Sequence, residues 1–411
     1  MIPRFKPSLG VAEFWAALTA GGEAVTSFEA AFAATFGARH ALAYSYGRSA
    51  LWAFLRALDL HDAEVVVPAY TCSVVAHAVV LSGNRPRFVD ISLDDYTMDL
   101  DGVARALNRD TRAVVATHLF GYPMNTEVLR AVVADAEGRY GRKIWIVQDC
   151  AHSFAAEWSG RPVQREPDLA LFGLNITKTI TSIFGGVLTT DDDALAARLR
   201  SFRDQTYISP GAWKRLRRLA YLAAVYPAFT SAGYAAIERL ARRTPLLNRF
   251  TIAYHRDEVI AFPPDHLEGM SPAEAAAGTV QLAKYTAIVR RRIEHARFYH
   301  TQLCDVPGLA PAPIVAGATY SHYVARTPNR DAVRTALLRR GIELGQLIEY
   351  SLPDTSPYRP YARGQEFPNA AQASRSLINL PVSADLTEHD RDRIGTELRR
   401  CVPENLGGRP T

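Results

Sequence analysis

The sequence predicts an α/β protein with a mostly parallel central sheet, helices on both sheet faces and a smaller C-terminal α/β domain. Apolar strand-like runs alternate with amphipathic helical runs, several of these strands end on a polar residue, and 411 residues exceed one ordinary core. We expect a large domain with an N-terminal arm over 1–206, a helical insertion over 207–266, and a long helix with the small domain over 267–411.

The composition excludes several classes of protein. A content of 48% apolar and 22% charged residues is typical of soluble globular proteins, and a net charge of +5 is small for a nucleic-acid binder of this length. The four cysteines form no CxxC pair, which argues against a zinc site and a disulfide framework. With no apolar leader and no stretch of roughly 18 apolar residues, we expect a cytoplasmic protein without metal.

The first elements form a candidate anion site. An extended arm and a helix fill residues 1–40, and the strand HALAYSY then leads through Gly47-Arg48-Ser49 into the helical run ALWAFLRALDL. The first N–H groups of a helix lack internal partners, and the helix dipole favours negative charge there. The Arg48 guanidinium and the Ser49 hydroxyl can add to this site, so we predict a phosphate-binding turn.

The alternation continues to Asp149. The expected strands, separated by amphipathic helices, are EVVVPAY, RPRFVDI, RAVVATHLFG and KIWIVQD. Polar residues occur where three of them end, at Tyr70-Thr71, His118 and Asp149. Because ligands of parallel α/β sheets bind at the carboxyl ends of the strands, we expect a site at this edge, and His118 and Tyr350 are further candidates for its lining.

The centre of the chain is the run from Asp168 to Thr190, which contains a single lysine. Lys178 lies between two apolar, β-favouring runs and is followed by Gly185-Gly186. A lysine and an aspartate at one sheet edge suit pyridoxal phosphate, because a desolvated amine is neutral enough to form imines and a carboxylate keeps the ring nitrogen protonated. We therefore predict that Lys178 carries the cofactor and that Asp149 holds its ring nitrogen.

The insertion over residues 207–266 interrupts the alternation. Its helical pattern is basic at both ends and apolar in the middle, with Lys214, Arg215, Arg217 and Arg218 beside an apolar run. Three interpretations remain open: a helical excursion packed on its own domain or across a dimer, a peripheral membrane contact at the inner face of the cell membrane through 212–242, or a lid over a bulky substrate.

Seven stretches, in the same order along the chain, resemble motifs of the DegT/DnrJ/StrS family of sugar aminotransferases. The resemblance covers nearly the whole chain outside the insertion and implies the fold-type I aminotransferase architecture. The stretches are FEAAFAATFG, VPAYT, FVDISLDDYTMDL, HLFGYP, QDCAHSFA, FGLNITKTITSIFGG and a tail set of AGTVQL, RRGIEL and INLP.

The resemblance also implies roles for individual residues. Lys178 takes the place of the Schiff-base lysine, and Asp149 takes the place of the aspartate on the pyridine nitrogen. His152 matches a residue near the ring hydroxyl, and Arg48 and Ser49 match the first phosphate contacts.

Four departures from the family pattern surround the same site. Cys72 stands where an aromatic side chain stacks on the cofactor ring, and Gly173 replaces a serine five residues before the lysine. Residues 267–270 replace the motif NYRM, whose asparagine reaches the partner subunit's phosphate, and the GEGG glutamate is lost in IFGG. Ring stacking and two phosphate contacts are therefore altered, whereas the lysine–aspartate pair is kept.

The activity that the resemblance implies is transamination in a homodimer with a shared active site. An amino donor, glutamate by analogy, would supply the amino group to a keto-sugar linked to a nucleotide, in polysaccharide or antibiotic sugar biosynthesis. Two alternatives stay open: a related reaction on a non-sugar or lipid-linked ketone, and a non-catalytic relative with a binding or regulatory role. Lys178 and Asp149 argue against the second alternative.

Overall fold

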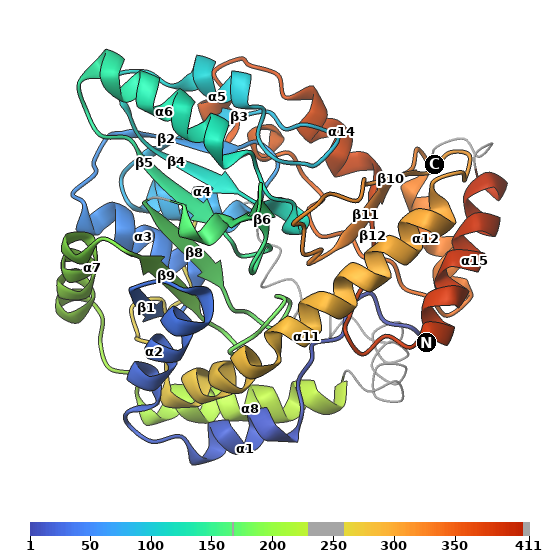
Figure 1. The fold of residues 1–411 in the computed structure, drawn as a ribbon, viewed down its shortest axis with the longest axis horizontal. Helices are drawn as coiled ribbons and strands as arrows, with labels where there is room; N and C mark the ends of the chain where they lie inside the picture. Colours follow the sequence, from blue (N-terminus) through green and yellow to red (C-terminus); the bar gives the residue numbers. More distant parts are fainter. Residues whose placement is uncertain (167, 229–258, 406–411) are drawn as a thin grey trace.

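The central sheet of the molecule has seven strands. The computed structural model describes residues 1–166, 168–228 and 259–405 (Figure 1). All strands of this sheet run parallel except β9, which pairs antiparallel with both of its neighbours. The predicted mostly parallel α/β sheet is thus confirmed. The strand order is β1 (His40–Tyr44), β9 (Gly186–Thr190), β8 (Leu169–Gly173), β5 (Trp145–Asp149), β4 (Thr111–Thr117), β2 (Glu64–Pro68) and β3 (Arg85–Val89).

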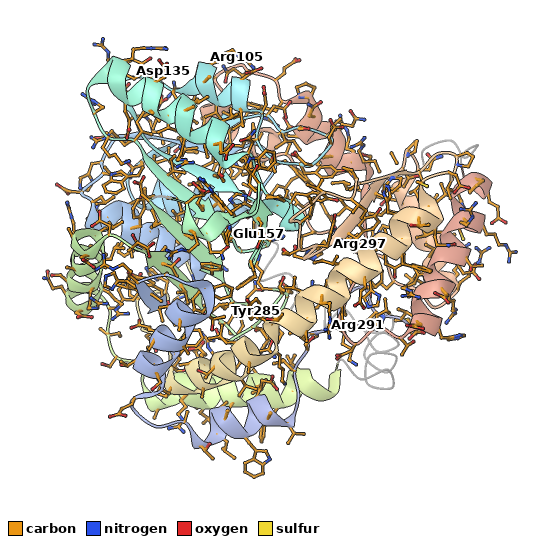
Figure 2. All side chains as sticks on the ribbon, in the orientation of Figure 1. Arg105, Asp135, Glu157, Tyr285, Arg291 and Arg297 are labelled. Atoms are coloured by element: carbon orange, nitrogen blue, oxygen red, sulfur yellow. The ribbon has the colours of Figure 1, made fainter. Side chains whose placement is uncertain are left out.

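Helices cover both faces of this sheet, because alternate strand residues point to opposite sides. On β5, Ile146 packs with α5 and α6, whereas Val147 belongs to the core under α3, α4 and α7. Arg105 and Asp135 lie on the outer sides of α5 and α6 (Figure 2), so these helices are amphipathic as the sequence predicts. The helix bounds are α3 (Gly47–Ala57), α4 (Ser73–Leu81), α5 (Leu100–Ala106), α6 (Thr126–Tyr140) and α7 (Asp193–Thr206).

The predicted long helix is α11 (Pro272–Leu303), which runs from the central sheet to a second sheet (Figure 1). A capping box starts it: the Ser271 hydroxyl accepts from the Glu274 N–H, and the Glu274 carboxylate accepts from the Ser271 N–H. Its first half packs against α2 (Ala24–Phe36) so closely that a Cβ at Gly278 would lie 2.7 Å from the Phe28 ring. Helix α11 therefore connects the two sheets as one continuous element.

The second sheet is small and antiparallel. It contains β10 (Ala310–Pro311), β11 (Tyr323–Arg326) and β12 (Leu377–Leu380), and the tail runs SHYVART and SLINLPVS contribute β11 and β12. Helices α12 (Arg330–Arg339) and α15 (Glu388–Glu404) lie beside it (Figure 1). The domain boundaries at 206/207 and 266/267 stay a prediction.

The described part of the insertion begins with α8 (Ala212–Ala228), beside α1 (Val11–Thr19) (Figure 1). Residues 229–258, which contain part of the predicted membrane contact, lie outside the described residues. Within the described ranges, we find no helix with both the length and the apolarity that crossing a bilayer requires.

Candidate active site

A pocket opens at the carboxyl edge of the central sheet, where the sequence predicts a site. Its lining comes from segments at the ends of β1, β2, β4, β5 and β8, which lie far apart in the sequence but meet at one edge. The polar and small residues of the lining are Tyr46, Gly47, Arg48, Thr71, Cys72, Thr117, Asp149, His152, Gly173, Asn175, Lys178 and Gly185.

Lys178 lies in the loop between β8 and β9 and not at a strand end, because β8 already ends at Gly173. A turn holds it, in which the Lys178 N–H donates to the Asn175 carbonyl over 3.0 Å. The surrounding protein removes the ammonium group from water and lowers the pKa of Lys178, while Cys72 and Asp149 oppose this shift. The amine is therefore easier to deprotonate than an ordinary lysine.

Gly173 lies beside this lysine. A Cβ at Gly173 would be in ordinary contact with the Lys178 Cε at 3.5 Å and in tight contact with the Ala151 Cβ at 3.3 Å. The departure from the serine of the family pattern thus occurs where a side chain would crowd Ala151.

Asp149 closes β5 and is 4% exposed. Its carboxylate accepts hydrogen bonds from the Thr117 hydroxyl over 3.3 Å and from the Ala151 N–H over 3.1 Å. Burial raises the pKa of Asp149, whereas these two donors and Lys178 oppose the rise. Since both donors are neutral groups, the buried carboxylate can still accept a proton-bearing cation such as a protonated pyridine nitrogen.

His152 connects the pocket to the small antiparallel sheet. The Ser321 hydroxyl lies 3.2 Å from the His152 Nδ1 and 3.1 Å from the His322 Nδ1. Burial and nearby cations lower the pKa of His152 well below its usual value and that of His322 to about 3. Both imidazoles are therefore neutral at physiological pH, which lets each donate and accept.

Five polar residues at and around the pocket were not predicted from the sequence, namely Tyr46, Thr117, Asn175, Ser321 and His322. Thr117 has a recognisable signal, since it precedes the polar strand end at His118. Ser321 and His322 have none, because they come from a distant segment that the loop before β11 brings to His152.

The predicted phosphate turn lies at the start of α3. Tyr46, Gly47 and Arg48 line the pocket, whereas Ser49 is fully buried behind them, with its hydroxyl 3.5 Å from the Ser45 hydroxyl. The turn packs directly on β9: a Cβ at Gly186 would lie 2.5 Å from the Gly47 nitrogen. The glycine after Gly185 is thus required for the close approach of the two backbones.

The remaining candidates divide between the pocket and the core. Cys72 lines the pocket at the start of α4, where the family has its stacking aromatic side chain. His118 does not line it: its Nε2 lies 2.9 Å from the Gln148 Oε1, and its Nδ1 accepts from the Met124 N–H over 2.9 Å. The Tyr350 hydroxyl accepts from the first N–H of α4, that of Ser73, over 2.9 Å, and Tyr350 also lies outside the lining.

The cations of α8 lend no support to the membrane interpretation, which requires a basic outer face. Lys214 and Arg218 are buried, at 1% and 7% exposure, because they bind carbonyl and carboxylate oxygens of residues 265–274. Trp213 and Leu216 face outward instead. Two of the four cations on which that interpretation rests are therefore inside the protein.

Comparison with known proteins identifies the family of this chain. The model of the DegT/DnrJ/EryC1/StrS aminotransferase family matches residues 13–226 and 266–399. MJ1066, an uncharacterized protein of Methanocaldococcus jannaschii, is 24% identical over 98% of both chains.

Solved structures show the same fold. The sugar aminotransferase CalS13 from Micromonospora echinospora superposes with a TM-score of 0.77 at 22% identity, over 97% of this chain and 100% of that chain. The aminotransferase TlmJ from Streptoalloteichus hindustanus superposes with a TM-score of 0.75 at 25% identity, over 98% and 99%. The chain belongs to the DegT/DnrJ/EryC1/StrS aminotransferase family and is a pyridoxal phosphate-dependent enzyme of fold type I.

Proposed function

We propose that this enzyme transfers an amino group from glutamate to a keto-sugar, with a nucleotide-linked sugar as the acceptor. The observation that carries the transaminase chemistry is the meeting of Lys178 and Asp149 in one pocket, each with a pKa shifted by burial. The likeness to a sugar aminotransferase supports a sugar acceptor. The cytoplasmic location and the homodimer remain predictions from the sequence.

The residues of the pocket would each contact a different part of the cofactor. Pyridoxal phosphate, when bound, supplies the electron sink for the substrate's α-carbon. Asp149 would hold the proton on the ring nitrogen, and His152, neutral and fixed by Ser321, would bond the ring hydroxyl. Arg48 and the N–H groups at the start of α3 would bind the phosphate.

Lys178 would act twice. Its amine would hold the cofactor covalently, and the amine freed by the donor would take up the proton of the donor's α-carbon and then release it. Its lowered pKa favours the neutral amine that both tasks need. We thus assign Lys178 as the general base and acid of the reaction.

A buried, unbalanced cation supports an anionic amino donor. Arg292 on α11 is 2% exposed, and burial lowers its pKa to about 10. Within the described residues, its guanidinium makes one hydrogen bond, to the Ser321 carbonyl over 2.5 Å, and its Nε has no partner. Arg292 lies outside the lining of the pocket, but its charge helps to lower the pKa of His152. A buried charge without a counter-ion is costly, so a carboxylate bound on the His152 side of the pocket would be stabilised.

Replacing Arg292 with methionine should therefore weaken the binding of an amino donor that carries this carboxylate. We expect the KM for L-glutamate to rise about tenfold, the effect of losing one charged partner. The amino alcohol analogue of glutamate that lacks the α-carboxylate should react at a nearly unchanged rate. Arg291→Met is the matched control, because Arg291 is half-exposed and pairs with Glu294 over 2.8 Å. An equal loss of activity with L-glutamate and with the amino alcohol analogue would contradict this role of Arg292.

The acceptor can be identified from the aminated form of the enzyme. Treatment with L-glutamate should bleach the visible absorbance of the covalently bound cofactor, and the correct ketone should restore it. We expect a nucleotide-linked keto-sugar to do so. Restoration only by a lipid-linked or non-sugar ketone would favour the alternative acceptor, and a protein that no amino donor bleaches would refute the proposed transamination.

A further inference from the structure

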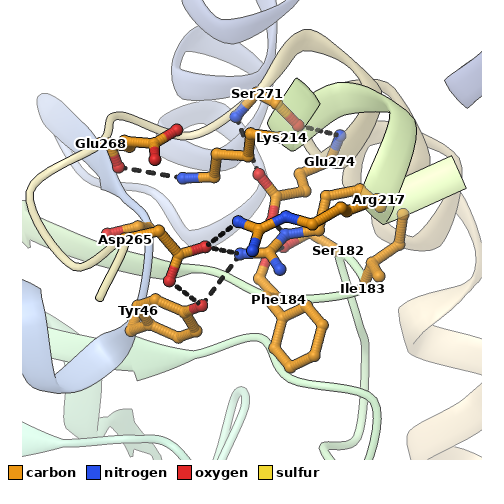
Figure 3. Close-up of polar contacts among 12 residues, drawn as sticks. Tyr46, Ser182, Ile183, Phe184, Lys214, Arg217, Asp265, Glu268, Ser271 and Glu274 are labelled. Atoms are coloured by element: carbon orange, nitrogen blue, oxygen red, sulfur yellow. Dashed lines mark hydrogen bonds and ion pairs between the residues drawn. The ribbon is translucent and has the colours of Figure 1, made fainter. Parts of the chain in front are cut away.

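The insertion helix α8 is anchored beside the active-site pocket through Arg218, whose partners Tyr46, Asp265 and Glu274 are labelled in Figure 3. The guanidinium donates to the Asp265 carboxylate over 2.8 Å, to the Glu274 carboxylate over 2.6 Å and to the Tyr46 hydroxyl over 2.9 Å. The Tyr46 hydroxyl in turn donates to Asp265 over 2.7 Å. We call Tyr46, Phe184, Arg218, Asp265 and Glu274 the Arg218 cluster.

The Arg218 cluster joins two segments that line the pocket to the long helix α11. Tyr46 lines the pocket and immediately precedes Gly47 and Arg48 of the phosphate turn. Phe184 belongs to the loop that leads from Lys178 to β9, and the Arg218 guanidinium lies 4.4 Å from its ring centre. Glu274 is in the first turn of α11. One side chain of the insertion thus contacts the turn, the lysine loop and the long helix.

The same helix contacts positions where the sequence departs from the family pattern. Phe184 lies in the stretch that lost the GEGG glutamate. In the stretch that replaces NYRM, the Glu268 and Gly269 carbonyls accept from the Lys214 ammonium over 3.0 and 2.8 Å. Helix α8, whose residues 212–226 fall within the part of the chain that the family model matches, therefore contacts both altered stretches.

The cluster is tightly held because Arg218 pairs with two buried carboxylates, and Arg217 also donates to Asp265 over 3.2 Å. The Arg218 side chain is 8% exposed, and those of Asp265 and Glu274 are 9% and 0% exposed. Removing one partner of such a buried pair leaves an uncompensated charge, which costs far more than the loss of a surface ion pair. Tyr46 is consequently fixed between a cation and a carboxylate.

We propose that Arg218 is a positioning residue for the cofactor: through Tyr46 and Phe184 it fixes the phosphate turn and the lysine loop, so that cofactor affinity depends on the insertion. This rests on the proposed binding of the cofactor phosphate at the turn of residues 46–48. Arg218 itself does not line the pocket and acts only through its neighbours.

The test is the affinity of the full-length apoprotein for pyridoxal phosphate, measured by absorbance titration. Arg218→Met should raise the Kd at least about tenfold, and Tyr46→Phe, which removes one hydroxyl and leaves the ion pairs intact, should raise it several-fold. The loss of binding free energy in the double variant should be smaller than the sum of the losses in the two single variants. In both single variants, the ³¹P resonance of the bound cofactor should shift, which reports on the turn itself.

Arg215→Met is the matched control on the same helix. Arg215 donates to the Leu18 and Ala20 carbonyls over 3.0 and 3.1 Å, so it ties α8 to the N-terminal arm and not to the pocket. Its Kd and ³¹P resonance should match the wild type. An equal effect of Arg215→Met, or an unchanged Kd and resonance in Tyr46→Phe, would overturn the inference.

Two further outcomes are also decisive. If Arg218→Met fails to fold, the Kd and the ³¹P resonance of Tyr46→Phe alone test the inference, because this variant keeps every ion pair of the cluster. Failure of the wild-type protein to bind pyridoxal phosphate would refute the proposed function together with this inference, whereas wild-type binding with unaffected variants would refute the inference alone.

Discussion

Lys178→Ala is expected to abolish turnover and the visible absorbance of the covalently bound cofactor. The amine is both the point of attachment and the proton carrier, and proton transfer by a positioned side chain alone is worth roughly 10²–10⁴-fold in rate. We therefore expect kcat to fall at least about 10³-fold. Borohydride reduction followed by mass spectrometry should locate the cofactor on Lys178 in the wild type and find none attached in the variant.

Lys178→Arg separates the two contributions of the side chain. It keeps a long basic side chain in the pocket, but an arginine stays protonated and cannot form the imine or exchange the proton. Activity comparable to the wild type in either variant would contradict the assignment. Addition of a small primary amine should restore part of the activity of Lys178→Ala but not of Lys178→Arg, because only alanine leaves space for it.

Asp149→Asn is expected to lower kcat by roughly 10²-fold or more, since it removes the charge that keeps the ring nitrogen protonated. The substitution keeps the size of the side chain, so the pocket should remain intact. Stopped-flow measurement of the reaction with glutamate isolates this step. Thr117→Val, which removes only a hydroxyl 3.3 Å from the carboxylate, should lower kcat no more than a few-fold. A larger loss in Thr117→Val than in Asp149→Asn would argue against this role of the carboxylate.

The same substitution should stabilise the apoprotein. Burial raises the pKa of Asp149 in the folded state above its unfolded value. The favourable contribution of the protonated form is therefore full below the unfolded pKa and is lost as the pH rises through the folded pKa. At neutral pH the ionised carboxylate costs stability that asparagine does not, so thermal unfolding of apo Asp149→Asn should occur at a higher temperature than that of the wild-type apoprotein.

The sequence predicted best what is periodic and local. Alternating apolar runs located the strands of the parallel sheet, and because parallel strands place their carboxyl ends at one edge, Asp149 and the loop of Lys178 were expected together. Polar residues at strand ends are not all ligands of a site, however. His118 has the position of a pocket residue, but its two ring nitrogens are taken up by Gln148 and Met124 inside the protein.

Ion pairs between residues far apart in the chain could not be predicted from the sequence pattern. A helix with Lys214 and Arg218 at one end suggests a basic surface, because lone cations are rarely buried. Their oxygen partners lie some fifty residues later in the chain, at 265–274, and nothing local in α8 indicates them. For the same reason, the contribution of Ser321 and Arg292 to the environment of His152 became visible only in the folded chain.

Helix α11 has a consequence for engineering this enzyme. Its first turn carries Glu274 of the Arg218 cluster, and Arg292, farther along the same helix, lies behind the His152 side of the pocket. The residues that we assign to the support of the phosphate turn and to the donor carboxylate thus lie on one continuous helix. A chimera that takes its C-terminal portion from a relative, to change the acceptor preference, should be joined after Leu303. A junction within residues 272–303 would take Glu274 and Arg292 from two different proteins and could shift them relative to each other along the helix.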